Sequence, residues 1–155
     1  MNHVIAAETL EATATNRTTK SVTRYLPTVV RVAFGLLLFV AGLNFFLNFI
    51  PQPTTPMPEG VVALTGGFIK SGYMFPLIGA THAVVGALLL TNRFVPLALA
   101  LIAPVIVNIV ALHSFLDHSG IPMALIVLAS EIYLAWTHRN AYRPMLAARA
   151  PLESK

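Results

Sequence analysis

The sequence contains no cysteine and very few charged residues. The absence of cysteine from all 155 residues excludes disulfide chemistry, thiolate metal sites and thiolate-ligated iron–sulfur clusters. Charged residues form 10% of the chain, whereas soluble domains carry about 25%. A Gly-rich phosphate-binding loop is also lacking, and no nucleophile motif surrounds Ser114, Ser119 or Ser130. These absences leave few enzyme classes open.

Hydrophobic residues instead dominate the sequence. They form 56% of the chain, and the mean hydropathy is +0.74. A soluble domain of this size cannot bury so much apolar side chain, because small domains keep a large fraction of their surface exposed. The composition therefore predicts an integral membrane protein. The net charge of +4 does not indicate nucleic-acid binding, because the basic residues flank apolar segments and form no patch with interleaved aromatics.

Four apolar runs are candidates for membrane-spanning helices. About 20 apolar residues cross the hydrocarbon, and the turn-forming stretches "PQPTTPMPEG", "TNR" and "DHSG" separate the runs. The first run is too long for a cleaved signal core, which has roughly 7–15 residues. The sequence thus predicts an all-α, antiparallel bundle of four transmembrane helices. The predicted spans are Leu26–Ile50, Tyr73–Leu90, Phe94–Leu116 and Ile121–Thr137.

Polar segments flank and interrupt the predicted bundle. Residues 1–24 are rich in Thr and Ala and predict a disordered or loosely helical tail, residues 25–143 form the membrane domain, and residues 144–155 form a C-terminal tail. The stretch "EGVVALTGGFIKSG" after the first span has its apolar residues on one helix face but is too short to cross. We expect a short helix that lies at the membrane interface or re-enters the membrane.

The distribution of Lys and Arg predicts the orientation. Nine of the ten basic residues lie on one side of the predicted spans, and only Lys70 lies on the other. Because positive charge is enriched in cytoplasmic segments, both termini are predicted to be cytoplasmic. The nine residues are Arg17, Lys20, Arg24, Arg31, Arg93, Arg139, Arg143, Arg149 and Lys155.

One polar residue per span falls at a similar depth. With a rise of about 1.5 Å per residue, Asn44, His82, Asn108 and Glu131 lie roughly 9–15 Å below the outer surface, and His113 lies nearer that surface. A lone carboxylate at this depth costs several kcal/mol, so we expect Glu131 to pair with His82, with help from the two asparagines. These five side chains predict a polar ligand-binding pocket in the outer half of the bundle.

A structural interpretation of the same residues is equally open. Intramembrane Asn and His often join helices through hydrogen bonds of about 0.6 kcal/mol each. The four-residue spacing of His113 and Asp117 predicts a structural pair at a helix end. Haem ligation by His82 and His113 is disfavoured, because their depths differ by about 9 Å. No cluster of zinc ligands is evident.

Small residues and a proline mark two of the spans. A stripe of small residues on the second span would let another helix approach closely, either within the chain or between chains. Pro104 is predicted to kink the third span. The stripe consists of Gly79, Ala83, Gly86 and Ala87.

Three stretches resemble the DoxX family of small bacterial membrane proteins. These are "RVAFGLLLFVAGLNFFLNFIPQP", "SGYMFPLIGATHAVVGALLLTNRFVPLALALIAPVIVNIVALH" and a last span ending "YLAWTHRNAYRPML", and the likeness covers about residues 31–146. The resemblance implies a four-helix bundle in a bacterial inner membrane. The family is named after a subunit of a quinone-linked oxidoreductase, and some members are linked to complexes that handle thiol or oxidative stress. Relatives often carry Glu where this chain has His82, and His near Asn48, which weakens any transfer of a catalytic role.

The sequence supports two main functions. The first is an accessory subunit that binds a quinone or lipid and associates with a respiratory or oxidoreductase complex or with copies of itself, because a polar layer beneath an apolar mouth suits a quinone headgroup and tail. The alternative is a purely structural subunit or assembly factor without a ligand. A transporter or proton conduit would need oligomers, since four helices are few. An independent enzyme is disfavoured by the missing cofactor motifs.

Overall fold

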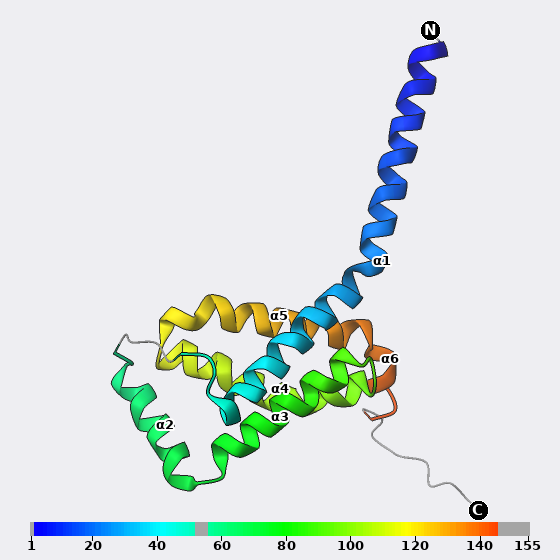
Figure 1. Cartoon of the computed structure of the whole chain (residues 1–155). Helices are drawn as coiled ribbons and strands as arrows, with labels where there is room; N and C mark the ends of the chain where they lie inside the picture. The colour runs from blue at the N-terminus through cyan, green and yellow to red at the C-terminus, as the bar shows by residue number, and fades with distance from the viewer. Residues whose placement is uncertain (1, 52–55, 146–155) are drawn as a thin grey trace, which may run out of the picture.

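The computed structural model describes residues 2–51 and 56–145, with side chains from residue 24 onward, and this part of the chain is helical with short turns (Figure 1). Five α-helices and two single-turn segments follow one another along the chain. They are α1 (Asn2–Leu47), α2 (Glu59–Ser71), α3 (Met74–Leu90), α4 (Val95–Phe115), η1 (His118–Gly120), α5 (Ile121–Thr137) and α6 (Arg139–Tyr142).

The helix boundaries agree closely with those predicted for the four spans. The fourth span has the predicted bounds, and the second and third differ only at their end residues. The first helix ends at Leu47 rather than Ile50, and it begins at Asn2, so residues 2–24 follow the helical alternative predicted for the N-terminal tail and continue the first span. The C-terminal tail predicted for residues 144–155 lies outside the described residues from 146 onward.

Three helical segments are long and apolar enough to cross a membrane, and a fourth span exists only if two bent helices are counted together. The three segments are Arg24–Leu47, Val95–Phe115 and His118–Thr137. Helices α2 and α3 pass the same test as a pair, with a bend of 93° at the break between them. The helix predicted after the first outer loop is therefore confirmed as α2, which lies across one end of the body (Figure 1).

The C-terminal half of α1 packs with α3, α4 and α5 around one apolar core. Helix α1 contacts α3 and α5, and α4 contacts the same two helices, so α3 and α5 lie on opposite sides of the core. In a lipid environment, close van der Waals packing of these side chains, rather than the exclusion of water, holds the helices together. The buried core residues are Phe34, Leu38, Val85, Leu89, Val95, Ala98, Leu99, Ile102, Ile106, Val127 and Leu134.

Glycines allow α1 and α3 to touch backbone to backbone. A Cβ atom at Gly42 would lie 2.8 Å from the Ala83 Cα and from the Gly79 carbonyl oxygen. A Cβ at Gly86 would lie 2.7 Å from the Phe39 Cα, a distance shorter than real Cβ atoms show to such neighbours. The small-residue stripe on α3 therefore serves contact within the chain. Small residues are common where membrane helices approach this closely.

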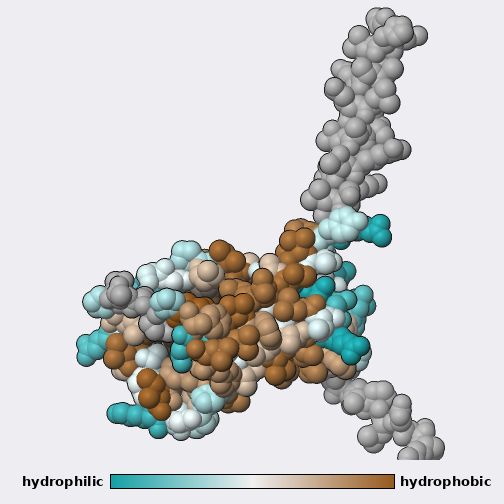
Figure 2. All heavy atoms as spheres, in the orientation of Figure 1, coloured by the Kyte–Doolittle hydropathy of each residue, from teal (hydrophilic) through white to brown (hydrophobic). Residues whose placement is uncertain are grey.

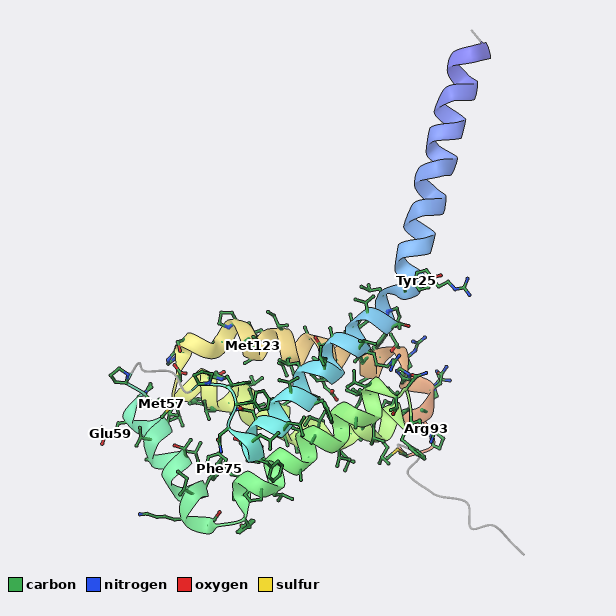
Figure 3. All side chains as sticks on the ribbon, in the orientation of Figure 1. Tyr25, Met57, Glu59, Phe75, Arg93 and Met123 are labelled. Carbon is green, nitrogen blue, oxygen red and sulfur yellow. The ribbon has the colours of Figure 1, made fainter. Side chains whose placement is uncertain are left out.

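Polar contacts tie the helices together at the end of the body opposite α2. The Arg31 guanidinium of α1 donates to the carbonyl oxygen of Leu89, in the last turn of α3. A cation is favoured at a helix C-terminus because it meets unpaired carbonyls and the negative end of the dipole. The Tyr142 hydroxyl donates to the Pro96 carbonyl oxygen at 2.9 Å and so joins α6 to the start of α4. Figure 3 shows Arg93 at this end and Glu59 at the other.

The outer surface of the body is apolar in its middle. Figure 2 shows hydrophobic residues across the centre of this face and hydrophilic residues toward both ends. Many large apolar side chains are exposed on the helices, including Leu36, Leu77, Val107 and Ile132. A contiguous apolar surface of this extent is unfavourable in water and suits a lipid environment. The fold is consistent with a membrane protein.

Candidate functional site

His82 lies buried in the middle of α3, with only 6% of its surface exposed. Its Nδ1 is 2.8 Å from the carbonyl oxygen of Ile78, one turn earlier in the same helix. A carbonyl only accepts hydrogen bonds, so Nδ1 carries the proton and Nε2 is left to accept from another group. No described residue supplies a hydrogen bond to Nε2. The imidazole is thus held in one orientation with one nitrogen available.

A row of aromatic rings connects α2 with His82. The ring of Phe68 in α2 meets Phe75 edge to face at 5.9 Å between centroids, and Phe75 lies 5.7 Å from Phe45 of α1. Phe45 in turn lies 6.0 Å from the imidazole of His82. Such offset and edge-on pairs are the favoured aromatic geometries. Figure 3 places Phe75 near the start of α3, so this aromatic row leads from the α2 end of the body toward the imidazole.

The missing side chain of Gly79 allows the aromatic row to pack against α3. A Cβ at this position would lie 2.6 Å from the Cβ of Phe45, so any larger residue would push Phe45 outward. Phe45 keeps 37% of its surface exposed, whereas His82 beside it is buried. The partly exposed Phe45 ring therefore packs beside the imidazole, so a molecule that binds at this side of His82 would also contact Phe45.

Glu131 is the second buried ionisable residue, located in α5. It is 6% exposed, and its Oε2 has no hydrogen-bond partner. The pair predicted between His82 and Glu131 is not formed, because the only histidine–carboxylate pair within 4.0 Å among the described residues is His113–Asp117. The reason is geometric: α3 and α5 face each other across the core, with α1 and α4 between them. Glu131 and His82 are therefore not paired.

Asn44 does not help to pair those two residues but terminates α1. Its Oδ1 accepts from the backbone N–H of Ile50 at 2.7 Å. Asn48, one turn later, donates its own N–H to the Asn44 carbonyl and adopts a left-handed φ of 48°. Asn tolerates this conformation at a helix C-terminus better than most residues. The prediction that Asn44 lines the pocket is therefore not supported by its contacts, which are local.

Asn108 also differs from its predicted place. It lies on the exposed face of α4, while Ile102 and Ile106 of the same helix point into the core. No described residue forms a hydrogen bond with its side chain, so the interior position predicted for it is wrong. Each residue turns a helix by about 100°, so a position along the helix axis does not determine which way its side chain points.

His113 forms the local pair that its spacing predicts. Its Nδ1 lies 3.0 Å from the carbonyl oxygen of Asp117 and 3.6 Å from the Asp117 carboxylate. The ring lies directly over Gly120, where a Cβ would collide with it. The pKa of Asp117 is lowered, first by the hydrogen bond from the Ser119 hydroxyl and to a smaller extent by the neighbouring histidines. This pair shapes the turn between α4 and α5 and does not meet His82.

Among the described residues, the five side chains predicted to line one pocket form no hydrogen bond or ion pair with one another. His82 and Glu131 are buried without being paired, Asn44 and His113 bond locally at helix ends, and Asn108 faces outward. Among the described residues, no group of three potential metal-ligating side chains comes together. Sequence reasoning missed the aromatic row, although Phe68 and Phe75 flank the break before α3 and could have suggested it.

The comparisons with known proteins add no identification. No family model matches the sequence, and no curated protein and no solved structure matches the chain.

Proposed function

We propose that this chain is a small integral membrane subunit, similar to DoxX proteins, that binds the headgroup of a quinone or lipid beside His82 and assists a larger oxidoreductase or respiratory complex. In this proposal α1, α3, α4 and α5 each cross a bacterial inner membrane, and both termini are cytoplasmic. The clustering of Arg31, Arg93 and Arg139 near one end of the helices supports that orientation. The apolar surface in Figure 2 supports the membrane location.

The observation that carries the proposal is the unused hydrogen-bonding capacity of the buried ionisable residues. Among the described residues, His82 bonds only within its own helix, and Glu131 Oε2 has no hydrogen-bond partner. If these residues served to join helices, we would expect interhelical hydrogen bonds from them, as Arg31 and Tyr142 make. Buried polar groups are normally satisfied, and an unsatisfied one often marks a functional role. The ligand-binding function is therefore favoured over the purely structural one.

The surroundings of His82 suit a flat ring that carries carbonyl or hydroxyl oxygens. Nε2 can accept from a hydroxyl, and when protonated it can donate to a carbonyl. Phe45 and Phe75 offer aromatic faces on which such a ring stacks. An isoprenoid or acyl tail would remain in the surrounding hydrocarbon. A quinone satisfies all three requirements, and a lipid headgroup satisfies the first and last.

The test is to purify the full chain from its membranes in a mild detergent and to quantify co-purified quinones and lipids by mass spectrometry. We expect a near-stoichiometric molecule that is lost in His82→Leu. Thr81→Ala is the matched control, because Thr81 neighbours His82 and also bonds only to its own helix, at Leu77 O. A wild-type protein without any specific ligand, or equal binding by His82→Leu, would refute the proposal.

A second variant protects the test against misfolding. His82→Gln keeps a side chain with a donor and an acceptor, so it should fold and retain part of the binding. Far-UV circular dichroism and gel filtration report whether each variant keeps its helices. If His82→Gln folds but binds as poorly as His82→Leu, the imidazole itself is required; if all variants bind alike, the ligand lies elsewhere.

A further inference from the structure

The outward face of α4 contains an asparagine in an otherwise apolar, exposed surface. Asn108 is exposed, and no described residue bonds its amide. It lies roughly 10 Å from the Phe115 end of α4 and roughly 20 Å from the Val95 end. An amide without partners is unfavourable in hydrocarbon, and the short Asn side chain cannot reach the headgroups from this depth. The position requires a polar partner from outside the chain.

The residues around Asn108 follow the spacing of a paired helix. Along α4, Leu97, Leu101, Pro104, Asn108, Ala111 and Phe115 alternate at separations of four and three. This heptad spacing is that of helices that cross at about +20° in left-handed pairs. Leu97, Leu101 and Phe115 are 52%, 48% and 80% exposed, and Ala111 is half-buried. We call these six residues the outer face of α4.

Pro104 adds a second polar group to this part of the helix. Proline has no N–H, so the carbonyl of Ala100 lacks its helical partner, and Ala100 is itself exposed. Freed backbone groups in membrane helices are tolerated where a neighbouring helix, a side chain or water compensates them. The outer face of α4 is therefore less suited to lipid than the exposed apolar face of α5.

We propose that the outer face of α4 is the contact between two copies of this chain. Copies inserted in the same orientation are related by a two-fold axis along the membrane normal, so the two α4 helices run parallel and equivalent residues meet. An asparagine amide has both donor and acceptor, so Asn108 of each copy donates to the other. A polar residue at one core position of a heptad pair fixes register and pairing. The self-complementary amide favours a second copy over an unrelated helix.

The absence of cysteine makes the contact directly testable by cross-linking. Leu101→Cys places a single thiol at a position where parallel paired helices come within disulfide range. Ile132→Cys on α5 is the matched control, with similar exposure (57%) and similar distance from the same end of the body. The full chain is oxidised in its membranes and analysed by non-reducing electrophoresis. We expect a disulfide-linked dimer for Leu101→Cys and little for Ile132→Cys.

Asn108 is then replaced in the Leu101→Cys background. Asn108→Leu should weaken association about 3- to 30-fold, the range expected for interhelical polar contacts, whereas Asn108→Gln should retain the dimer. Cross-linking only to a chain of different mass, equal cross-linking at the control position, or no effect of Asn108→Leu would each overturn the proposal. Because Leu101 and Asn108 are exposed on α4 whereas His82 is buried in α3, failure here leaves the ligand-binding proposal separately testable.

Discussion

The close contact of α1 and α3 makes a sharp prediction for Gly42→Ala. The added methyl would lie 2.8 Å from two backbone atoms of α3, well inside ordinary contact distance. Backbone atoms of a helix cannot rotate aside as a side chain can, so the two helices must move apart. Overpacking of this kind typically costs about 1–3 kcal/mol, and separation would also loosen the neighbouring contacts around Gly79 and Gly86.

Gly66→Ala provides the matched control. Gly66 also lies inside a helix, but an added Cβ there would meet nothing within 4 Å. Replacement of a helical glycine by alanine raises helix stability by up to about 1 kcal/mol, and this gain applies to both variants. The difference in unfolding free energy between Gly42→Ala and Gly66→Ala therefore isolates the interhelical contact. We expect Gly42→Ala to be less stable by about 1–3 kcal/mol.

The assay is an SDS titration of the purified chain in mild detergent micelles. The single tryptophan, Trp136, reports on α5, and far-UV circular dichroism reports on all helices. Gly42→Ala should unfold at lower SDS than the wild type, and Gly66→Ala at equal or higher SDS. If the two variants unfold together, α1 and α3 do not touch at Gly42 and the packing described above is wrong.

Three further predictions concern polar residues. Burial, and to a smaller extent the charge of Glu131, raise the pKa of Tyr142, so the folded chain favours the neutral phenol. This contribution to stability is lost as the pH rises above about 10. Tyr142→Phe should therefore reduce the loss of thermal stability measured from pH 8 to 11. Glu131→Gln should move the Tyr142 titration, followed by phenolate absorbance, to lower pH, and an unchanged titration would mean that the two residues are not coupled. Gly120→Ala should displace the His113 ring and abolish its contact with Asp117. The displacement should change the His113 imidazole signal in NMR spectra. A signal like that of the wild type would refute the position of the ring over Gly120.

The helices could be predicted because turn-forming residues in the local sequence mark where each helix ends. Turn residues between Leu90 and Val95, and between Phe115 and Ile121, interrupt apolar runs that otherwise continue. The small-residue stripe on α3 likewise predicted close helix contact, since Gly leaves room that another backbone fills. The sequence left residues 1–24 open between disorder and helix, because a segment rich in Thr carries low intrinsic helix propensity, and the structure continues α1 to Asn2.

The site could not be predicted to the same degree, because an almost wholly apolar helix gives no signal for which face turns inward. In a water-soluble helix the polar residues mark the outside, but in α4 both the buried Ile102 and the exposed Leu101 are apolar. The interior position predicted for Asn108 therefore rests on its depth alone. Its heptad spacing with Leu101 and Pro104 was present in the sequence and would have indicated a shared outer face.

The role of each polar residue in the spans depends on its hydrogen-bond partners rather than on its depth. Asn44 accepts from the backbone just beyond the end of its own helix, and His113 contacts its own turn, so both act locally. Glu131 and His82 are buried with capacity left over, and Asn108 is exposed with none of its capacity used. Since unsatisfied groups are costly in hydrocarbon, His82 favours a bound small molecule and Asn108 favours another protein surface. A ligand and a second copy would thus satisfy different groups on different faces of the same bundle, so the loss of either one should leave the other intact.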